Sequence, residues 1–259
     1  MDTFLNFTIF IFGLIIGSFL NCVIYRLTPR QYNGGGLLRG RSFCPHCKHV
    51  LSWLDLIPVL SFLFLRGKCR YCQKPISLQY PVVEIATGAV FLLIILAVSN
   101  IYTYAYLLLM SCFLIVIFVY DLKYYIIPDK IIYPAIAAAL IYNLLMSDIP
   151  RMSDILMSAF GAAAFFLAIV LVSRGKWMGV GDIKLAFFMG LLLGWPNILT
   201  ALFLAFFIGA IMGLGLILSG KKTLKSEVPF GPFLVAGTFL AMFWGSEIVN
   251  WYLNLFLLQ

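Results

Sequence analysis

Two aspartates are the residues of this sequence whose type and setting could do chemistry. Asp182 closes the stretch Gly179-Val180-Gly181-Asp182 at the start of an apolar run, and Asp121 ends an earlier apolar run. A carboxylate in such sequence is energetically costly and needs a reason to be there. Two carboxylates that face one another cannot both ionise freely, so one stays protonated while the other acts as a base toward water. This chemistry suits cleavage of a peptide bond without a covalent intermediate.

Each aspartate also has a purely structural interpretation. A carboxylate at a helix end can pair with a nearby lysine, which here is Lys123 or Lys184. Asp129, which follows Pro128, is a rival member of the acid pair, although it could instead cap the helix that begins there. The sequence leaves these alternatives open.

Four of the six cysteines form two C-x2-C pairs, Cys44 with Cys47 and Cys69 with Cys72, and 21 residues lie between the pairs. Four thiolates at this spacing suit tetrahedral zinc, and four protein ligands are typical of a structural site. An iron–sulfur cluster and two redox dithiols are the alternatives. We expect the basic residues around the pairs to lower the pKa of the thiols and to favour ligation.

The sequence that must position these groups is mostly apolar. Of the 259 residues 63% are hydrophobic and 11% are charged, whereas a soluble domain has about 25% charged residues. We therefore predict an all-α polytopic membrane protein, because lipid offers no partner to exposed backbone groups. The first run is too long for a cleaved signal peptide and lacks a basic start. We expect eight spans, near 3–25, 82–99, 103–120, 129–146, 155–173, 183–195, 197–218 and 230–257.

The run after Asp182 is the shortest of the eight, because Gly194-Trp195-Pro196 interrupts it, and whether it crosses fully stays open. We divide the chain into a first transmembrane helix (1–25), a cytosolic insert (26–80) and a seven-helix membrane domain (81–259) that carries both aspartates. Small residues at 17–18, 161–164 and 209–215 predict close contact between helices.

The basic residues orient the predicted spans. The insert holds nine of the 18 Lys and Arg residues but only one acid, Asp55. If the insert is cytosolic, every Lys and Arg except Arg151 falls on the cytosolic side, as positively charged loops do. The net charge of +8 then needs no nucleic-acid partner, and we predict none. Asp121 and Asp182 both lie at cytosolic helix ends in this topology, and both termini face outside.

Over nearly its whole length the sequence resembles the type IV prepilin peptidases, which are membrane aspartyl proteases of the Gly-x-Gly-Asp type. Gln79 departs from the arginine expected in this family. The resemblance rests on motifs that occur in one order: Gly17-Ser18-Phe19-Leu20-Asn21 with Ile24-Tyr25-Arg26, the two cysteine pairs with Leu65-Arg66-Gly67-Lys68-Cys69, Ile76-Ser77-Leu78-Gln79-Tyr80-Pro81-Val82-Val83-Glu84, Asp121 with Ile127-Pro128-Asp129, Gly179-Val180-Gly181-Asp182, and Val228-Pro229-Phe230-Gly231-Pro232-Phe233.

The resemblance implies that Asp121 and Asp182 are the catalytic pair of an enzyme in the bacterial inner membrane. The implied substrate is a type IV prepilin or pseudopilin, whose basic leader is removed at the cytosolic face, after a glycine. Members with a cysteine-bearing insert also methylate the new N-terminus with S-adenosylmethionine. No Gly-rich nucleotide motif supports that second activity, and Gly67, Lys68 and Glu84 are the candidates for its cofactor site. A leader peptidase without methyltransferase activity is the alternative.

Two other classes of protein could use the same residues. A proton-coupled transporter could use the two aspartates as a relay, although the sequence lacks the paired interrupted helices of transporter repeats. A thiol oxidoreductase could use the two C-x2-C pairs, but a cytosolic position argues against stable disulfides.

Overall fold

The computed structural model describes residues 2–28, 40–220 and 228–257. Within these ranges every regular element is a helix, apart from two isolated β-bridges in the insert. The all-helical prediction is therefore confirmed for the described part of the chain. Five basic residues used for the predicted orientation lie outside these ranges: Arg30, Arg39, Lys221, Lys222 and Lys225.

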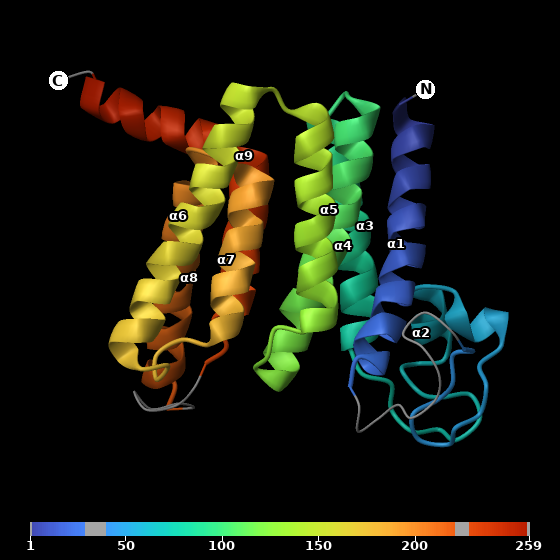
Figure 1. The fold of residues 1–259 in the computed structure, drawn as a ribbon. Helices are drawn as coiled ribbons and strands as arrows, with labels where there is room; N and C mark the ends of the chain where they lie inside the picture. Colours follow the sequence, from blue (N-terminus) through green and yellow to red (C-terminus); the bar gives the residue numbers. More distant parts are fainter. Residues whose placement is uncertain (1, 29–39, 221–227, 258–259) are drawn as a thin grey trace. The chain divides into compact units, whose positions relative to one another are not determined.

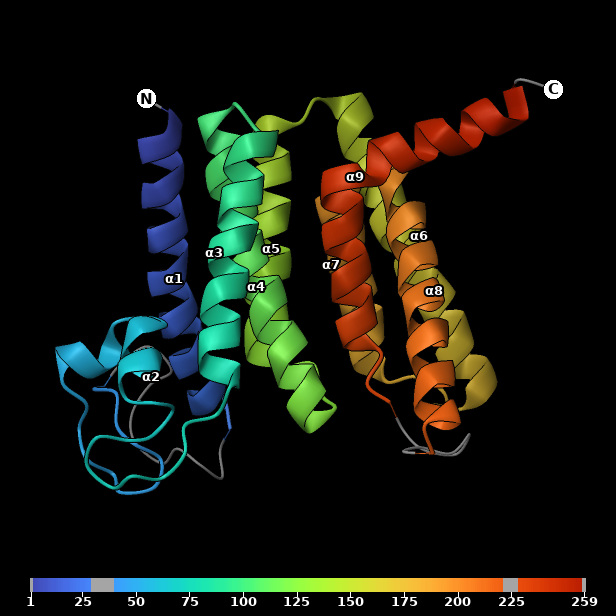
Figure 2. The same ribbon diagram turned by 180° about the vertical axis from the view of Figure 1, so that it is seen from behind.

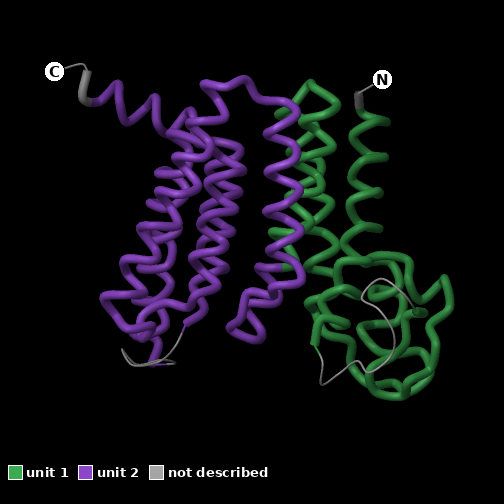
Figure 3. Tube along the Cα trace, in the orientation of Figure 1, with its two compact units in different colours: residues 1–116 green, residues 117–259 purple. Residues whose placement is uncertain are grey.

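The chain forms two compact units, residues 1–116 and 117–259 (Figure 3). In the first unit α1 (Asp2–Arg26) packs along α3 (Gln79–Ala97), and the short helices η1 (Trp53–Leu56) and α2 (Leu60–Phe64) lie between them in the chain. A Cβ atom on Gly17 would lie 2.7 Å from the Cα atom of Glu84. The predicted close contact at residues 17–18 is thus confirmed at Gly17.

α4 (Ile101–Tyr124) crosses the boundary between the units, and its last turns, which carry Asp121, belong to the second. The second unit continues with α5 (Asp129–Met146), α6 (Ile149–Ser173), α7 (Val180–Leu193), α8 (Asn197–Leu218) and α9 (Gly231–Leu257). Successive helices α6, α7 and α8 alternate in direction (Figures 1 and 2). α7 packs against α6, and α8 packs against α9.

The closest helix contacts of the second unit are at glycines other than those predicted, although Gly209, within a predicted stretch, does lie against Phe230 and Phe233. Gly190 lies against the backbone of Ala159, and Gly237 lies against that of Ala201. A Cβ atom on Gly161, Gly213 or Gly215 would meet nothing within 4 Å, so the expectation of close contact there is wrong for these residues. A small residue permits close approach, but the packed face of the helix decides where approach happens.

Seven of the helices in the described ranges are long and apolar enough to cross a membrane. The bounds of α5 and α8 agree with the predicted spans, whereas α4 continues past Asp121 to Tyr124. Of the eight predicted spans, α7 is the one that is not among these seven helices. Its 14 residues give a length of about 21 Å. The hydrocarbon core is about 30 Å thick, so α7 does not span it by length alone.

Candidate active site and metal site

Asp121 lies on the last turns of α4 and is buried. Its carboxylate accepts a hydrogen bond from the backbone N–H of Gly231, the first residue of α9. A Cβ atom on Gly231 would lie 2.5 Å from Oδ2 of Asp121. Only a residue without a side chain therefore lets α9 begin against this carboxylate.

Aromatic packing fixes the start of α9. The ring of Phe230 lies 6.2 Å from that of Phe166 on α6 and 5.0 Å from that of Phe206 on α8, between ring centroids. Phe230 also packs on Phe233, one turn further along α9. The phenylalanines here are packing residues, and they hold the Gly231 N–H at its position beside Asp121.

Asp182 lies in the first turn of α7 and is also buried. Its Oδ2 atom accepts a hydrogen bond of 3.2 Å from the backbone N–H of Gly179, which precedes the helix. A carboxylate at this position is favoured by the helix dipole. Gly181 brings the backbone of α7 against Ile127, because a Cβ atom there would lie 3.1 Å from Cβ of Ile127. The Gly-x-Gly-Asp stretch therefore both caps α7 and packs it closely.

The two buried carboxylates interact electrostatically: the charge of Asp121 acts on Asp182. Neither of them has an ion pair among the described residues, where Arg70–Asp55 and Lys184–Asp129 are the pairs formed. The structural interpretation that paired Lys184 with Asp182 is therefore wrong. Both aspartates are buried acids whose hydrogen bonds come from glycine backbone.

Asp129, the rival member of the acid pair, has a different environment. It is the first residue of α5, its side chain is 60% exposed, and its Oδ1 atom lies 2.6 Å from Nζ of Lys184. Lys184 also lies over the ring of Tyr133, 4.9 Å from its centroid. Asp129 thus joins the start of α5 to the start of α7 through an ion pair.

The two cysteine pairs of the insert have the same local geometry. In each, the first cysteine donates its N–H to the carbonyl five residues later, Cys44 to His49 and Cys69 to Lys74, both at 2.9 Å. The fourth residue after each of these cysteines, Lys48 and Gln73, has a positive φ. β-bridges close both turns. The two turns are matching zinc-knuckle folds of the backbone.

The four thiols converge. The Sγ atoms of Cys44, Cys47, Cys69 and Cys72 all lie within 4.8 Å of one another, and those of Cys44 and Cys72 are 3.9 Å apart. A tetrahedral zinc ion with bonds of about 2.3 Å separates its sulfur ligands by about 3.8 Å. The donor set and its spacing fit zinc. Burial raises the pKa of Cys44, but hydrogen bonds from the N–H groups of Cys47 and His46 and from the thiols of Cys47 and Cys69 together outweigh it and bring the pKa to about 7.

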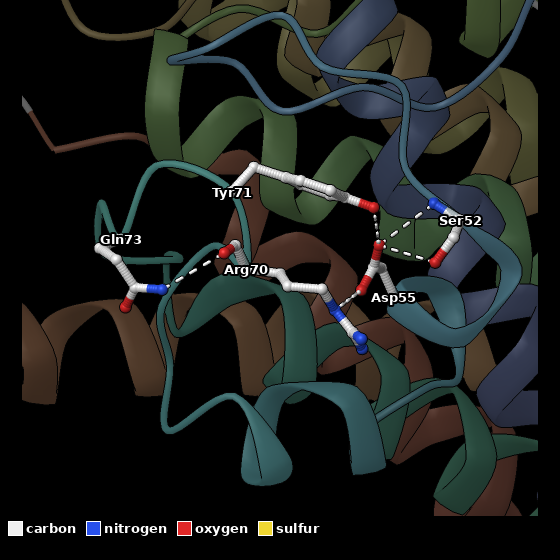
Figure 4. Close-up of polar contacts among 5 residues, drawn as sticks. All are labelled: Ser52, Asp55, Arg70, Tyr71 and Gln73. Carbon is white, nitrogen blue, oxygen red and sulfur yellow. Dashed lines mark hydrogen bonds and ion pairs between the residues drawn. The ribbon is translucent and has the colours of Figure 1, made fainter.

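Asp55, to which sequence reasoning gave no role, joins the second knuckle to Ser52, which follows the first knuckle (Figure 4). Its carboxylate accepts hydrogen bonds from the N–H and hydroxyl of Ser52, at 3.1 and 2.9 Å, and from Arg70 Nε at 2.8 Å. The hydroxyl of Tyr71 donates at 3.3 Å. Arg70 and Tyr71 are the two residues between Cys69 and Cys72. The available signal was that Asp55 is the one acid in a basic insert.

The three cofactor candidates are engaged in separate contacts. Glu84 is buried in α3, where its carboxylate accepts a hydrogen bond from Val59 N–H at 2.7 Å and another from Ser18. Gly67 has a φ of +69° and lies against the ring of Phe62. Lys68 forms the β-bridge with Pro75. No described contact joins the three into one site.

Two family models match the chain. The bacterial Peptidase A24 N-terminal domain matches residues 11–98, and the type IV leader peptidase family matches residues 108–214. A prepilin leader peptidase/N-methyltransferase of Aeromonas hydrophila is 34% identical over 96% of this chain and 94% of its own length. Proteins of the same name from Bacillus subtilis (strain 168) and Legionella pneumophila are 33% and 32% identical, covering 95% and 97% of this chain and 97% and 95% of their own lengths. No solved structure matches the chain.

Proposed function

Because this chain belongs to the type IV leader peptidase family, we propose that it is a membrane aspartyl endopeptidase whose catalytic pair is Asp121 and Asp182. Its substrate is a type IV prepilin or pseudopilin, and it removes the basic leader ahead of the substrate's apolar helix. The proton-transporter and thiol-oxidoreductase alternatives lose their support with this family membership.

The observation that carries the proposal is the environment of the two carboxylates. Both are buried, and each accepts a hydrogen bond from a glycine N–H. The two carboxylates interact electrostatically, and neither has a cationic partner among the described residues. Two buried acids without cations are costly when both are charged, which favours a state in which one of them is protonated. In that state one aspartate is a base and the other an acid, as peptide hydrolysis requires.

The reaction uses both protonation states. The ionised aspartate takes a proton from water as the water oxygen bonds to the scissile carbonyl carbon, while the protonated aspartate donates its proton to the carbonyl oxygen. Collapse of the resulting diol breaks the carbon–nitrogen bond. The amine leaves with the proton that came from water, and the diol returns a proton to the other aspartate, which restores the pair.

The cytosolic face is the proposed location of the pair. Asp121 is three residues before the end of α4, and Asp182 is two residues after the start of α7. If α7 is counted as an eighth crossing, these two ends lie on one side of the membrane, together with nearly all Lys and Arg residues. Both termini then face outside. The scissile bond of a prepilin, at the junction of its leader and its helix, would lie at the same interface.

Two further properties belong to the proposal. Cys44, Cys47, Cys69 and Cys72 hold a structural zinc ion, because a full set of four protein ligands leaves no open position for substrate. The enzyme also methylates the new N-terminus with S-adenosylmethionine, a role supported by the names of its relatives. That cofactor would supply the methyl group, and Gly67, Lys68 and Glu84 remain the proposed candidates for its site.

The test is leader removal by the purified full-length protein, followed by N-terminal mass analysis with and without S-adenosylmethionine. Asp121→Asn and Asp182→Asn each keep the size of the side chain but remove the acid. Each should lower the cleavage rate by about 10²–10⁴-fold, the usual contribution of general acid–base catalysis. A mass increase of one methyl group only with the cofactor would establish the second activity; its absence would leave a leader peptidase alone.

The matched control is Asp154→Asn, the same change at an exposed position on α6. It should cleave at the wild-type rate. If Asp121→Asn or Asp182→Asn cleaves like this control, that aspartate is not part of the mechanism.

A further inference from the structure

Residues 53–65 of the insert form an apolar segment that the first unit leaves uncovered. The segment contains η1 and α2, and neither helix has a buried residue. Trp53 is 74% exposed and Phe64 is 84% exposed. Exposed apolar clusters mark interaction sites. We use the name α2 patch for the six large apolar residues exposed here: Trp53, Leu54, Leu56, Leu60, Leu63 and Phe64.

The length of residues 53–65 limits the kinds of apolar segment that they can form. Thirteen residues are too few to cross a bilayer; apolar runs of about 10–14 residues are usually core helices, re-entrant or interfacial segments, or the apolar part of a signal peptide. Exposure excludes the first of these for η1 and α2. Because the segment lies at residues 53–65, far from the N-terminus, a position at the membrane interface fits it best.

A hydrogen bond sets the depth of the segment. The N–H of Val59, just before α2, donates to the carboxylate of Glu84 at 2.7 Å. Glu84 is five residues after α3 begins at Gln79, or about 8 Å along the helix axis. α3 is one of the candidate spans, and interfacial helices lie about 5–10 Å into the boundary of headgroups and acyl chains. Figures 1 and 2 show α2 beside the last turns of α1, with the knuckle loops beyond them.

The charges around the patch define the headgroups that it fits. The acid of the segment, Asp55, is directed to Ser52 and to Arg70 and Tyr71 of the second knuckle. Arg66 and Lys68, which follow the segment, are exposed. Between Arg41 and Lys74 the insert has six basic residues and one acid. The partner must therefore be apolar and anionic together, which a basic prepilin leader is not.

We propose that the α2 patch is a membrane-surface contact that seats the insert in an anionic leaflet. Its apolar side chains enter the boundary of headgroups and acyl chains, while Arg66 and Lys68 contact lipid phosphates. The two knuckles are thereby held at the surface of the membrane.

The test measures the depth of Trp53 in the full-length protein, reconstituted in vesicles of phosphatidylethanolamine and phosphatidylglycerol. The chain has five tryptophans, so the signal of Trp53 is the wild-type emission minus that of Trp53→Phe. Lipid with a doxyl group at acyl carbon 5 should quench this signal more than lipid with the group at carbon 12. Aqueous iodide should quench the signal at least twofold less than it does in the unfolded protein without detergent. Quenching by iodide but not by doxyl lipid would overturn the proposal and indicate a protein partner or open solvent.

A charged variant and a change of lipid make the result specific. Phe64→Glu should reduce doxyl quenching of Trp53 and increase iodide quenching, whereas Val50→Glu, the same change at an exposed apolar residue of the first knuckle, should not. Vesicles of phosphatidylcholine alone should give weaker doxyl quenching. Equal quenching in both lipids would overturn the part played by anionic headgroups. None of these readouts depends on leader cleavage.

Discussion

The Nζ atom of Lys184 lies 2.6 Å from the Oδ1 atom of Asp129, and this ion pair joins the fifth residue of α7 to the first residue of α5. Lys184 is two residues after Asp182, so the pair fixes the helix turn that carries a buried carboxylate. On the same side, Gly181 packs on Ile127, two residues before Asp129. The start of α7 is thus held by one ionic and one apolar contact to the segment that leads into α5.

Removal of the ion pair should affect catalysis more than stability. An exposed pair contributes about 0.2–1 kcal/mol to folding, but displacement of a catalytic group by about 1 Å can cost up to about 10²-fold in rate. We expect Lys184→Ala and Asp129→Ala each to lower kcat by a few-fold to about 10²-fold with little change in thermal stability. In a double-mutant cycle the double variant should be no slower than either single variant. Fully additive losses would show that the two residues act separately.

Gly231 should be intolerant of a side chain for a reason local to Asp121. In Gly231→Ala the new Cβ atom would lie 2.5 Å from Oδ2 of Asp121. The carboxylate must therefore move away from the backbone N–H that donates a hydrogen bond to it. We expect cleavage to fall by about 10-fold or more, with the secondary structure unchanged by circular dichroism. Gly213→Ala is the control, because a Cβ atom there meets nothing within 4 Å. Equal activity of the two variants would contradict the position of α9 against Asp121.

The zinc site should be structural. Metal analysis should find about one zinc ion per chain and almost none when Cys44, Cys47, Cys69 and Cys72 are all serine. Removal of zinc by a chelator should make residues 40–78 sensitive to protease within minutes, while leader cleavage by the remaining intact protein continues at first. An immediate stop of cleavage in an enzyme whose insert is still protected would instead assign zinc to the reaction.

Asp55 should control how firmly the insert holds its metal. Burial raises the pKa of Asp55, but the Ser52 hydrogen bonds and the charge of Arg70 outweigh it and lower the pKa below its usual value. The charged form therefore stabilises the insert above the ordinary pKa of about 4, and this contribution is lost as pH falls through the folded-state value. At pH 7 Asp55→Asn should weaken the insert by about 1.5–3 kcal/mol, measured as faster zinc release to a chelator.

Tyr71→Phe provides a matched comparison for Asp55. It removes only the longest of the four hydrogen bonds to the carboxylate, at 3.3 Å, and keeps the ring that packs on His49. Zinc release from this variant should be close to that of the wild type. Release as fast as from Asp55→Asn would show that the Tyr71 hydrogen bond, and not those from Ser52 and Arg70, carries the effect of the carboxylate.

The sequence predicted what depends on composition and local spacing. Apolar runs determine helices in lipid, so the bounds of α5 and α8 were correct, and the C-x2-C spacing determines knuckle turns, so the four thiols converge. Contacts between distant segments were not predictable, because several partners satisfy the same chemistry. Lys184 has Asp182 nearby in the sequence but pairs with Asp129, and Gly161 could face a helix but faces open space. The same limit explains why the role of Asp55 was not foreseen.

Val59 adopts a φ of +61°, a conformation in which a β-branched side chain clashes with its own backbone. Such strain costs about 1–3 kcal/mol and is tolerated because Glu84 fixes the N–H of this residue. Glycine at position 59 would adopt the same turn without that cost. The wild-type chain therefore keeps Val59 in a strained backbone conformation, and loss of the Glu84 carboxylate would allow this residue to leave it.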